Sequence, residues 1–167
     1  MLTLIPPPAE PRDGQGDWSV PEAEFGVVFP EQFKELVRSS GTGYFGMGFL
    51  DLYTPLTPSG RTRMRDHIQT MCELRDALEL SLIVHPEQPG LLPWGGDSNG
   101  HIYWWWTEGP PESWSIAQFA HDEEDDPHRA DVPIATFLVN YARNQYPEML
   151  GGLTYDESHL HFKSSES

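Results

Sequence analysis

LLPWGGDSNGHIYWWWTEGPPESW, residues 91–114, holds five of the six tryptophans in this chain of 167 residues. Gly96–Gly100 is rich in Gly, Asp, Ser and Asn, which favour tight turns because Gly and Asn adopt positive φ at little cost. The aromatic and β-branched residues of His101–Thr107 then predict a strand, which Gly109-Pro110-Pro111 ends. Nothing in the segment resembles a catalytic nucleophile, a phosphate-binding loop or a complete metal site. It therefore indicates a scaffold for recognition rather than an active site.

Successive side chains of this predicted strand point to opposite faces. Tyr103 and Trp105 share one face, and Ile102, Trp104 and Trp106 share the other. We expect one set to lie in the core. The other set either lies under a helix or forms an exposed aromatic patch, of the kind that anchors protein interfaces and stacks on sugars. Both arrangements stay open at this point, and Trp104 and Trp106 are candidate partner-binding residues.

The chain is strongly acidic, with a formal net charge of -16 from 26 acidic and 10 basic residues. Nucleic acids and anionic membranes would be repelled by this charge, so neither is expected as a partner. A basic protein would be attracted faster to an acidic surface, although acidic charge can also serve solubility alone. The length and the hydrophobic content of 38% predict one globular domain with a packed core.

Cys72 is the only cysteine, so an intramolecular disulfide is excluded, which suits a reducing compartment. It falls within a predicted helix with His67 on a different helical face, and we interpret it as a small core residue. The N-terminus lacks the basic and apolar regions of a signal peptide, and no apolar run is long enough to span a membrane. We therefore expect a soluble, cytoplasmic protein.

Hydrophobic periodicity predicts alternating helices and strands. Helices are expected over about residues 30–40 and 58–80, and after Asp131 as far as Pro147; strands are expected over 49–53, 101–107, 115–120 and 154–162. Residues 121–131 are interpreted as a loop. This order predicts an α+β fold, a single domain with a mainly antiparallel sheet covered by helices.

The chain divides into three parts by composition. Residues 1–16 are rich in Pro, Gly and charge and are expected to form a flexible N-terminal lead-in. Residues 17–146 form the predicted domain, and residues 147–167 form a C-terminal extension that can add one strand. In the second predicted helix, Arg61, Arg63 and Arg65 occupy the first turns, where the helix dipole disfavours cations, and they predict a local basic patch.

Two short motifs have a simpler structural interpretation than the function they suggest. GTGYFG at residues 41–46 matches G-x-G-x-x-G, but a dinucleotide site needs a strand before the motif and a helix after it. Here a helix precedes and a strand follows, so we interpret it as a helix-to-strand loop. DSNG at residues 97–100 resembles the start of an EF-hand, but its Gly comes too early and Trp106 occupies the position of the bidentate Glu.

Histidines near carboxylates suggest a metal site. His121 and His128 flank the acidic run at residues 122–126, and His159 and His161 would share one face of a strand. A structural zinc site normally takes four ligands and no cysteine pair is available, while an acidic run is usually a solvated loop. We therefore expect no metal and no cofactor.

Taken together, two blocks resemble the SUKH superfamily, in the branch that contains the eukaryotic cell-wall-synthesis regulator and many bacterial immunity proteins. The first block reads W-x3-E-x2-F-G-x2-F-P-x2-F-K-x-L-V over residues 18–37, followed by Gly41-x-Gly43. The second reads L-L-P-W-G-x-D-x-N-G-x2-Y-x-W-x-T-x-G over residues 91–109 and ends at Trp114. The closing helix of the family corresponds to about residues 131–146. Trp104 and Trp106, the acidic run and the tail beyond residue 147 depart from the family pattern.

The resemblance implies a non-enzymatic α+β domain that binds another protein, in many bacterial members a cognate toxin and often a nuclease. Since a nuclease must be basic to hold its substrate, an acidic inhibitor can mimic that substrate and associate rapidly. The candidate partner-binding residues are Asp122, Glu123, Glu124, Asp125, Asp126, Trp104 and Trp106. The motif residues Gly95, Asp97, Asn99 and Trp105 are expected to maintain the fold instead.

Two other functions stay open. The same fold can serve a regulatory adaptor with several weaker partners, or the chain can be a small metal-dependent hydrolase that uses His121, His128 and nearby carboxylates. The predicted basic patch at residues 61–65 can alternatively contact an acidic partner. The oligomeric state does not follow from the sequence.

Overall fold

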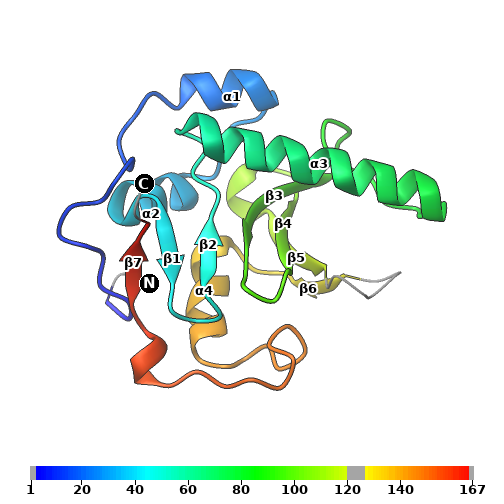
Figure 1. Ribbon diagram of the computed structural model, residues 1–167. Coiled ribbons are helices and arrows are strands. Elements are labelled where there is room, and N and C mark those ends of the chain that lie inside the picture. Colours follow the sequence, from blue (N-terminus) through cyan, green and yellow to red (C-terminus); the bar gives the residue numbers. More distant parts are fainter. Residues whose placement is uncertain (1–2, 120–126, 166–167) are drawn as a thin grey trace.

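A single antiparallel sheet forms the centre of the molecule (Figure 1). The structure is a computed structural model that describes residues 3–119 and 127–165. Within these residues the sheet has seven strands in the order β6-β5-β4-β3-β2-β1-β7. The strands are β1 (Gly43–Phe45), β2 (Leu50–Leu52), β3 (Leu91–Gly96), β4 (Ile102–Trp106), β5 (Ser115–Phe119), β6 (His128–Ala130) and β7 (Phe162–Ser164). The first six strands therefore form a meander, and β7 returns to pair with β1 at its open edge.

Four α-helices surround the sheet in the described part of the chain. They are α1 (Ser19–Phe25), α2 (Glu31–Ser40), α3 (Pro58–Leu78) and α4 (Ile134–Ala142). Helix α3 crosses β3 and extends beyond the sheet, as Figure 1 shows. The predicted single α+β domain with a sheet covered by helices is confirmed. None of the helices in the described ranges combines the length and the apolar character needed to cross a lipid bilayer.

The alternation along β4 separates two hydrophobic cores. Tyr103 and Trp105 lie in the larger core, together with residues of α2 and α4, and both are completely buried. Trp104 lies in a smaller core on the opposite face with Met71 of α3 and Leu91 of β3. Of the two arrangements that the sequence left open, burial under a helix is therefore the one that holds for Trp104.

Strand β3 is the main element that the sequence did not predict. Pro93, Gly95 and Gly96 are all disfavoured in the interior of a strand. The register between β3 and β4 shifts between Pro93 and Gly95, so a β-bulge accommodates the irregular segment. A Cβ on Gly95 would lie 2.7 Å from the backbone oxygen of Asp51, and one on Gly96 would lie 2.5 Å from Oη of Tyr53. The two glycines therefore allow β2 to approach β3 closely.

The turn between β3 and β4 is held by the carboxylate of Asp97. Its Oδ1 accepts hydrogen bonds from the backbone N–H groups of Asn99 at 2.9 Å and His101 at 3.1 Å. Its Oδ2 lies 2.8 Å from Nδ1 of His101 and accepts the hydroxyl of Tyr103 at 3.1 Å. Every one of these contacts is internal to the hairpin, which agrees with the prediction that this motif residue maintains the fold.

Several predicted boundaries are wrong for identifiable reasons. Helix α4 ends at Ala142 rather than near residue 147, because Asn144 adopts a positive φ of 59° and its side chain binds the backbone of Tyr155. The loop predicted over residues 121–131 contains β6, a short edge strand paired with β5. The motif at residues 41–46 follows a helix as predicted, but it contains β1 rather than only a loop.

Both ends of the described chain contact the domain. Ile5 is buried in the larger core, and Arg12 forms a backbone bridge with Gly41. The C-terminal strand spans Phe162–Ser164 and overlaps the predicted 154–162 segment only at Phe162, because residues 157–159 form a 3-10 turn capped by Asp156. The division of the chain at residues 16 and 146 stays a prediction.

Candidate functional site

Of the residues predicted to bind a partner, the structure describes only the two tryptophans. The acidic run Asp122–Asp126 lies outside the described residues. It follows Phe119, which pairs with Ile102, whereas Trp106 pairs with Ser115 at the other end of the same ladder. Phe119, the last residue described before the run, and Trp106 therefore lie at opposite ends of the β4–β5 pair, and Trp104 lies in its middle.

The two predicted tryptophans differ in their access to solvent. Trp104 is 1% exposed and packs against Phe119, so in this arrangement it offers no surface to a partner. Trp106 is half-buried and donates its indole N–H to Glu108 at 3.2 Å. The guanidinium of Arg129 lies 5.2 Å from the centroid of the Trp106 ring. Trp106, Glu108 and Arg129 are among the residues that line a pocket of about 280 Å³ at the start of β5.

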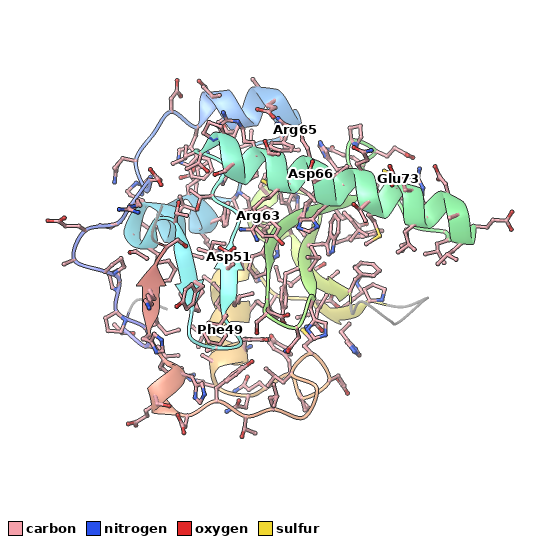
Figure 2. The ribbon with its side chains drawn as sticks, viewed as in Figure 1. Phe49, Asp51, Arg63, Arg65, Asp66 and Glu73 are labelled. Atoms are coloured by element: carbon pink, nitrogen blue, oxygen red, sulfur yellow. The ribbon has the colours of Figure 1, made fainter. Side chains whose placement is uncertain are left out.

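A second pocket, which we call the Phe49 pocket, lies where α3 meets the β1–β2 and β3–β4 turns. Its volume is about 260 Å³. Figure 2 shows Phe49, Asp51 and Arg63 in succession from the β1–β2 turn to α3. The lining residues are Phe49, Asp51, Tyr53, Arg63, His67, Gly96, Asp97, Ser98 and Ile102.

Phe49 combines an exposed aromatic side chain with an unusual backbone. Its φ is 54°, in the left-handed region that bulky residues rarely adopt, and its side chain is 57% exposed. The ring lies 5.3 Å from that of Tyr44. Both the backbone N–H and the hydroxyl of Ser98 donate to the carbonyl of Gly48 at 3.0 Å, which ties the two turns together. Strained residues of this kind are often found at functional sites, and here the surrounding contacts hold the strain in place.

Tyr53 organises the polar wall of the Phe49 pocket. The guanidinium of Arg63 lies 4.3 Å from the Tyr53 ring centroid. One helical turn later, His67 stacks on the same ring at 5.2 Å, with its Nε2 3.0 Å from the phenol oxygen. Burial is the main cause that raises the pKa of Tyr53 to about 12. Burial, followed by the charge of Arg63, lowers the pKa of His67, so Nε2 of the neutral imidazole can accept a hydrogen bond from the Tyr53 hydroxyl at neutral pH.

Asp51 forms an ion pair with Arg63 through Oδ2. Burial raises the pKa of the Asp51 carboxyl above its usual range, and the neighbouring guanidinium only partly opposes this effect. The carboxylate is therefore partly desolvated, and Arg63 is its single ion-pair partner in the described part of the chain.

The basic patch predicted on α3 consists of ion-paired residues. Arg61 and Arg65 both contact the carboxylate of Glu24 in α1, and Arg63 contacts Asp51. These carboxylates offset the unfavourable interaction between the arginines and the N-terminal end of the helix dipole. The predicted basic patch is therefore largely offset by two carboxylates on neighbouring elements, those of Glu24 and Asp51.

The residues considered as metal ligands are dispersed. His121 lies outside the described residues and His128 lies in β6. His159 ends the 3-10 turn and contacts Asp156 at 2.9 Å, whereas Nδ1 of His161 lies 2.8 Å from the carbonyl oxygen of Ser158, so the two do not share a strand as predicted. Among residues 3–119 and 127–165, no group of three or more His, Cys, Asp or Glu side chains is placed to hold a metal ion.

Sequence reasoning missed the Phe49 pocket because its residues come from four separate segments. One signal was available locally: Arg63 and His67 are four residues apart and therefore adjacent on one face of the predicted helix. The contact of these two residues with Tyr53 across the chain had no signal in the pattern of a single sequence.

One comparison with known proteins gave a match. A family model described as SUKH_6, SMI1-KNR4 cell-wall, matches residues 15–138. This range contains both motif blocks and ends within α4. No curated protein and no solved structure matches the chain significantly.

Proposed function

Because the chain belongs to the SUKH superfamily, in the family described as SMI1-KNR4 cell-wall, we propose that it binds another protein and neutralises a cognate toxin. SUKH domains are generally non-catalytic binding proteins, and an immunity role is compatible with the family. We place the protein in the cytoplasm, where a nuclease toxin would meet its substrate.

The Phe49 pocket is the observation that carries the protein-binding proposal. Exposed Phe49 and partly exposed Arg63 lie together there over the buried ring of Tyr53, and aromatic residues and arginine are enriched where protein interfaces hold most of their binding energy. The stacked rings of Tyr53 and His67 and their hydrogen bond hold the wall of the pocket in one arrangement. A prearranged surface loses less conformational entropy when a partner binds.

The acidic charge supports a basic partner. With a net charge of -16, the chain would attract a cationic toxin over a long range, and this attraction would weaken as salt screens it. We propose that the acidic run Asp122–Asp126 competes with phosphates for the basic residues of the toxin. Trp106 is proposed as a second contact. Buried Trp104 would instead stabilise β4 by packing in the smaller core under α3.

A regulatory adaptor is the second candidate. The cell-wall description of the matching family favours it, since it associates the family with a process other than toxin neutralisation. An adaptor would bind several partners weakly, and its presence would not protect cells against one lethal protein.

Affinity capture followed by a protection assay tests these two functions. The immobilised protein is incubated with lysate of its source cells, washed at low and moderate salt, and its ligands are identified by mass spectrometry. We expect one basic protein that survives both washes, kills cells when expressed alone and is harmless when this chain is co-expressed. Several weak ligands without lethality would contradict the immunity function and favour the adaptor.

Association kinetics test the contribution of the acidic run. A variant with residues 122–126 changed to Asn or Ser should bind the captured toxin with a lower association rate and a weaker dependence on salt. An unchanged rate would remove the acidic run from the mechanism, without affecting the protein-binding proposal.

A further inference from the structure

We propose that the Phe49 pocket receives a cationic side chain, a lysine ammonium or an arginine guanidinium, from the bound protein. This inference rests on the proposed protein-binding function and names the chemistry of the partner at this pocket. Its volume of about 260 Å³ is below the range typical of cofactor and drug-sized ligands, and it fits one side chain.

Asp51 is the group that recognises the cation. Its side chain is 27% exposed, and its recorded ion pair with Arg63 uses Oδ2. A carboxylate can accept bonds through both oxygens, and a partly desolvated carboxylate gains most from an additional charge-assisted bond. A second cation would therefore bind the other oxygen of Asp51 or replace Arg63 on the first.

The fixed charges of the pocket favour a cation over an anion. Asp51 is the carboxylate that a ligand can reach, Asp97 lies buried behind the lining with its oxygens engaged within the hairpin, and His67 is neutral near pH 7 because burial lowers its pKa. An incoming carboxylate would be repelled by Asp51 and, at a greater depth, by Asp97, whereas an incoming cation would be repelled by Arg63, which is half-exposed and can move toward solvent.

Arg63 has a second contact besides Asp51, so its guanidinium can move away from the carboxylate and remain bound. Its side chain is 48% exposed, and its guanidinium lies over the Tyr53 ring as well as against Asp51. If a partner's cation takes the carboxylate, Arg63 keeps the aromatic contact and remains hydrated at the rim. The exchange therefore leaves no buried charge without a partner.

The apolar lining fits the aliphatic part of the same side chain. Phe49 and Ile102 border the pocket, and the Phe49 ring is exposed to an approaching partner. Lysine and arginine place their methylene groups along apolar surfaces while their charged ends contact polar groups. An aromatic ring beside a carboxylate thus matches both ends of such a side chain.

A peptide titration followed by NMR tests the pocket without the toxin. The probes are blocked Ala-Arg-Ala, Ala-Glu-Ala and Ala-Leu-Ala, added at pH 7 to the uniformly ¹⁵N-labelled full chain. We expect the arginine peptide to shift amide signals of β2 and the β3–β4 turn, with a dissociation constant on the order of millimolar. Equal or stronger binding of the glutamate or leucine peptide would overturn the proposal.

Three variants locate the effect. Asp51→Asn should weaken binding of the arginine peptide about tenfold, as expected for the loss of one charge-assisted hydrogen bond. Arg63→Gln should strengthen it, because it removes the internal competitor, and this gain would not follow from a merely structural role. Glu35→Gln, which removes the exposed partner of Arg38 on α2, is the matched control and should change nothing.

The outcomes separate this inference from the proposed function. Unchanged binding in Asp51→Asn, or weaker binding in Arg63→Gln with a native amide spectrum, would overturn the cation site. If Asp51→Asn does not fold, Arg63→Gln alone decides. Toxin protection without peptide binding would overturn only the cation site, whereas peptide binding without any protection would overturn only the immunity function.

Discussion

The two faces of β4 carry similar aromatic residues that differ in their exposure to solvent. On the α2–α4 face, Trp105 is completely buried within the larger core. On the α3 face, only Trp104 in the middle of the strand is buried, while Ile102 and Trp106 at its ends are half-buried and border the two pockets. The comparison teaches that helix coverage, rather than residue type, decides which aromatic residues are available for recognition.

The polar groups on the two sides differ in the same way. Near the larger core, Tyr103 contacts Tyr141 at 2.9 Å and accepts a hydrogen bond from Gln118 at 2.9 Å. Burial is the main cause that raises the pKa of both tyrosines well above the usual range, so they stay neutral. In the Phe49 pocket, Asp51 and Arg63 instead form a partly exposed ion pair. The closed network joins neutral groups and ends on the buried carboxylate of Asp97, whereas the ion pair of the Phe49 pocket is partly exposed to a partner.

The largest expected effect is a loss of stability on the face of β4 that α2 and α4 cover. Trp105→Ala should destabilise the fold by about 3–5 kcal/mol, because it removes a completely buried indole and leaves a cavity. Trp106→Ala should cost less than about 1 kcal/mol, as expected for a side chain that remains partly in solvent. Chemical denaturation measures both free energies of unfolding. Equal losses would show that coverage by helices does not distinguish the two faces.

A smaller loss is expected where β2 meets β3, at the boundary between the core and the Phe49 pocket. Gly95→Ala places a methyl group 2.7 Å from the backbone oxygen of Asp51, so the strands must move apart at a cost of about 1–3 kcal/mol. Because Asp51 moves with β2, the same variant should also weaken binding of the arginine peptide. Gly151→Ala is the control for a glycine with a positive φ and open space around it. If Gly95→Ala proved no more harmful than this control, the close approach would be unimportant.

Phe49→Gly should separate binding from stability. Glycine adopts the φ of 54° without strain, which offsets the entropy that it adds to the unfolded chain, so the free energy of unfolding should stay within about 1 kcal/mol of the original. Loss of the exposed ring should nevertheless weaken binding of the arginine peptide. Denaturation and the NMR titration measure the two effects. A large destabilisation would show that Phe49 supports the fold instead of a partner.

The smallest expected effect is a pH dependence from two histidines. Burial lowers the pKa of both His67 and His85 in the folded protein, relative to about 6.5 in an unfolded chain. The unfolded state therefore binds more protons, and stability should fall as pH decreases from 6.5 toward the lowered folded pKa values. Replacing both with Gln should reduce the dependence of the free energy of unfolding on pH between pH 7.5 and about 5.5, as measured by chemical denaturation at each pH. A flat profile in the original chain would contradict this assignment.

Local features of the sequence were sufficient for most of the helices and for the turn and the second strand, β4, of the central hairpin. The apolar spacing of α2 and α3 predicted both helices, α2 to within one residue at its start and α3 to within two residues at its end. The turn at Asp97 followed from its Gly and Asx residues. Strand β3 was missed because Pro93 and two glycines disfavour a strand locally, while pairing on both sides stabilises it here.

The sequence by itself determined the fold class, the family and the acidic charge, because periodicity, turn residues and motif spacing are properties of neighbouring residues. The tertiary structure alone decided which tryptophans are covered, which arginines are paired and where a pocket forms. The Phe49 pocket depends on the contact between Ser98 and Gly48 and on the packing of Tyr53 against α3. Such contacts join residues that are distant along the chain, and they exist only once the sheet and α3 have packed together.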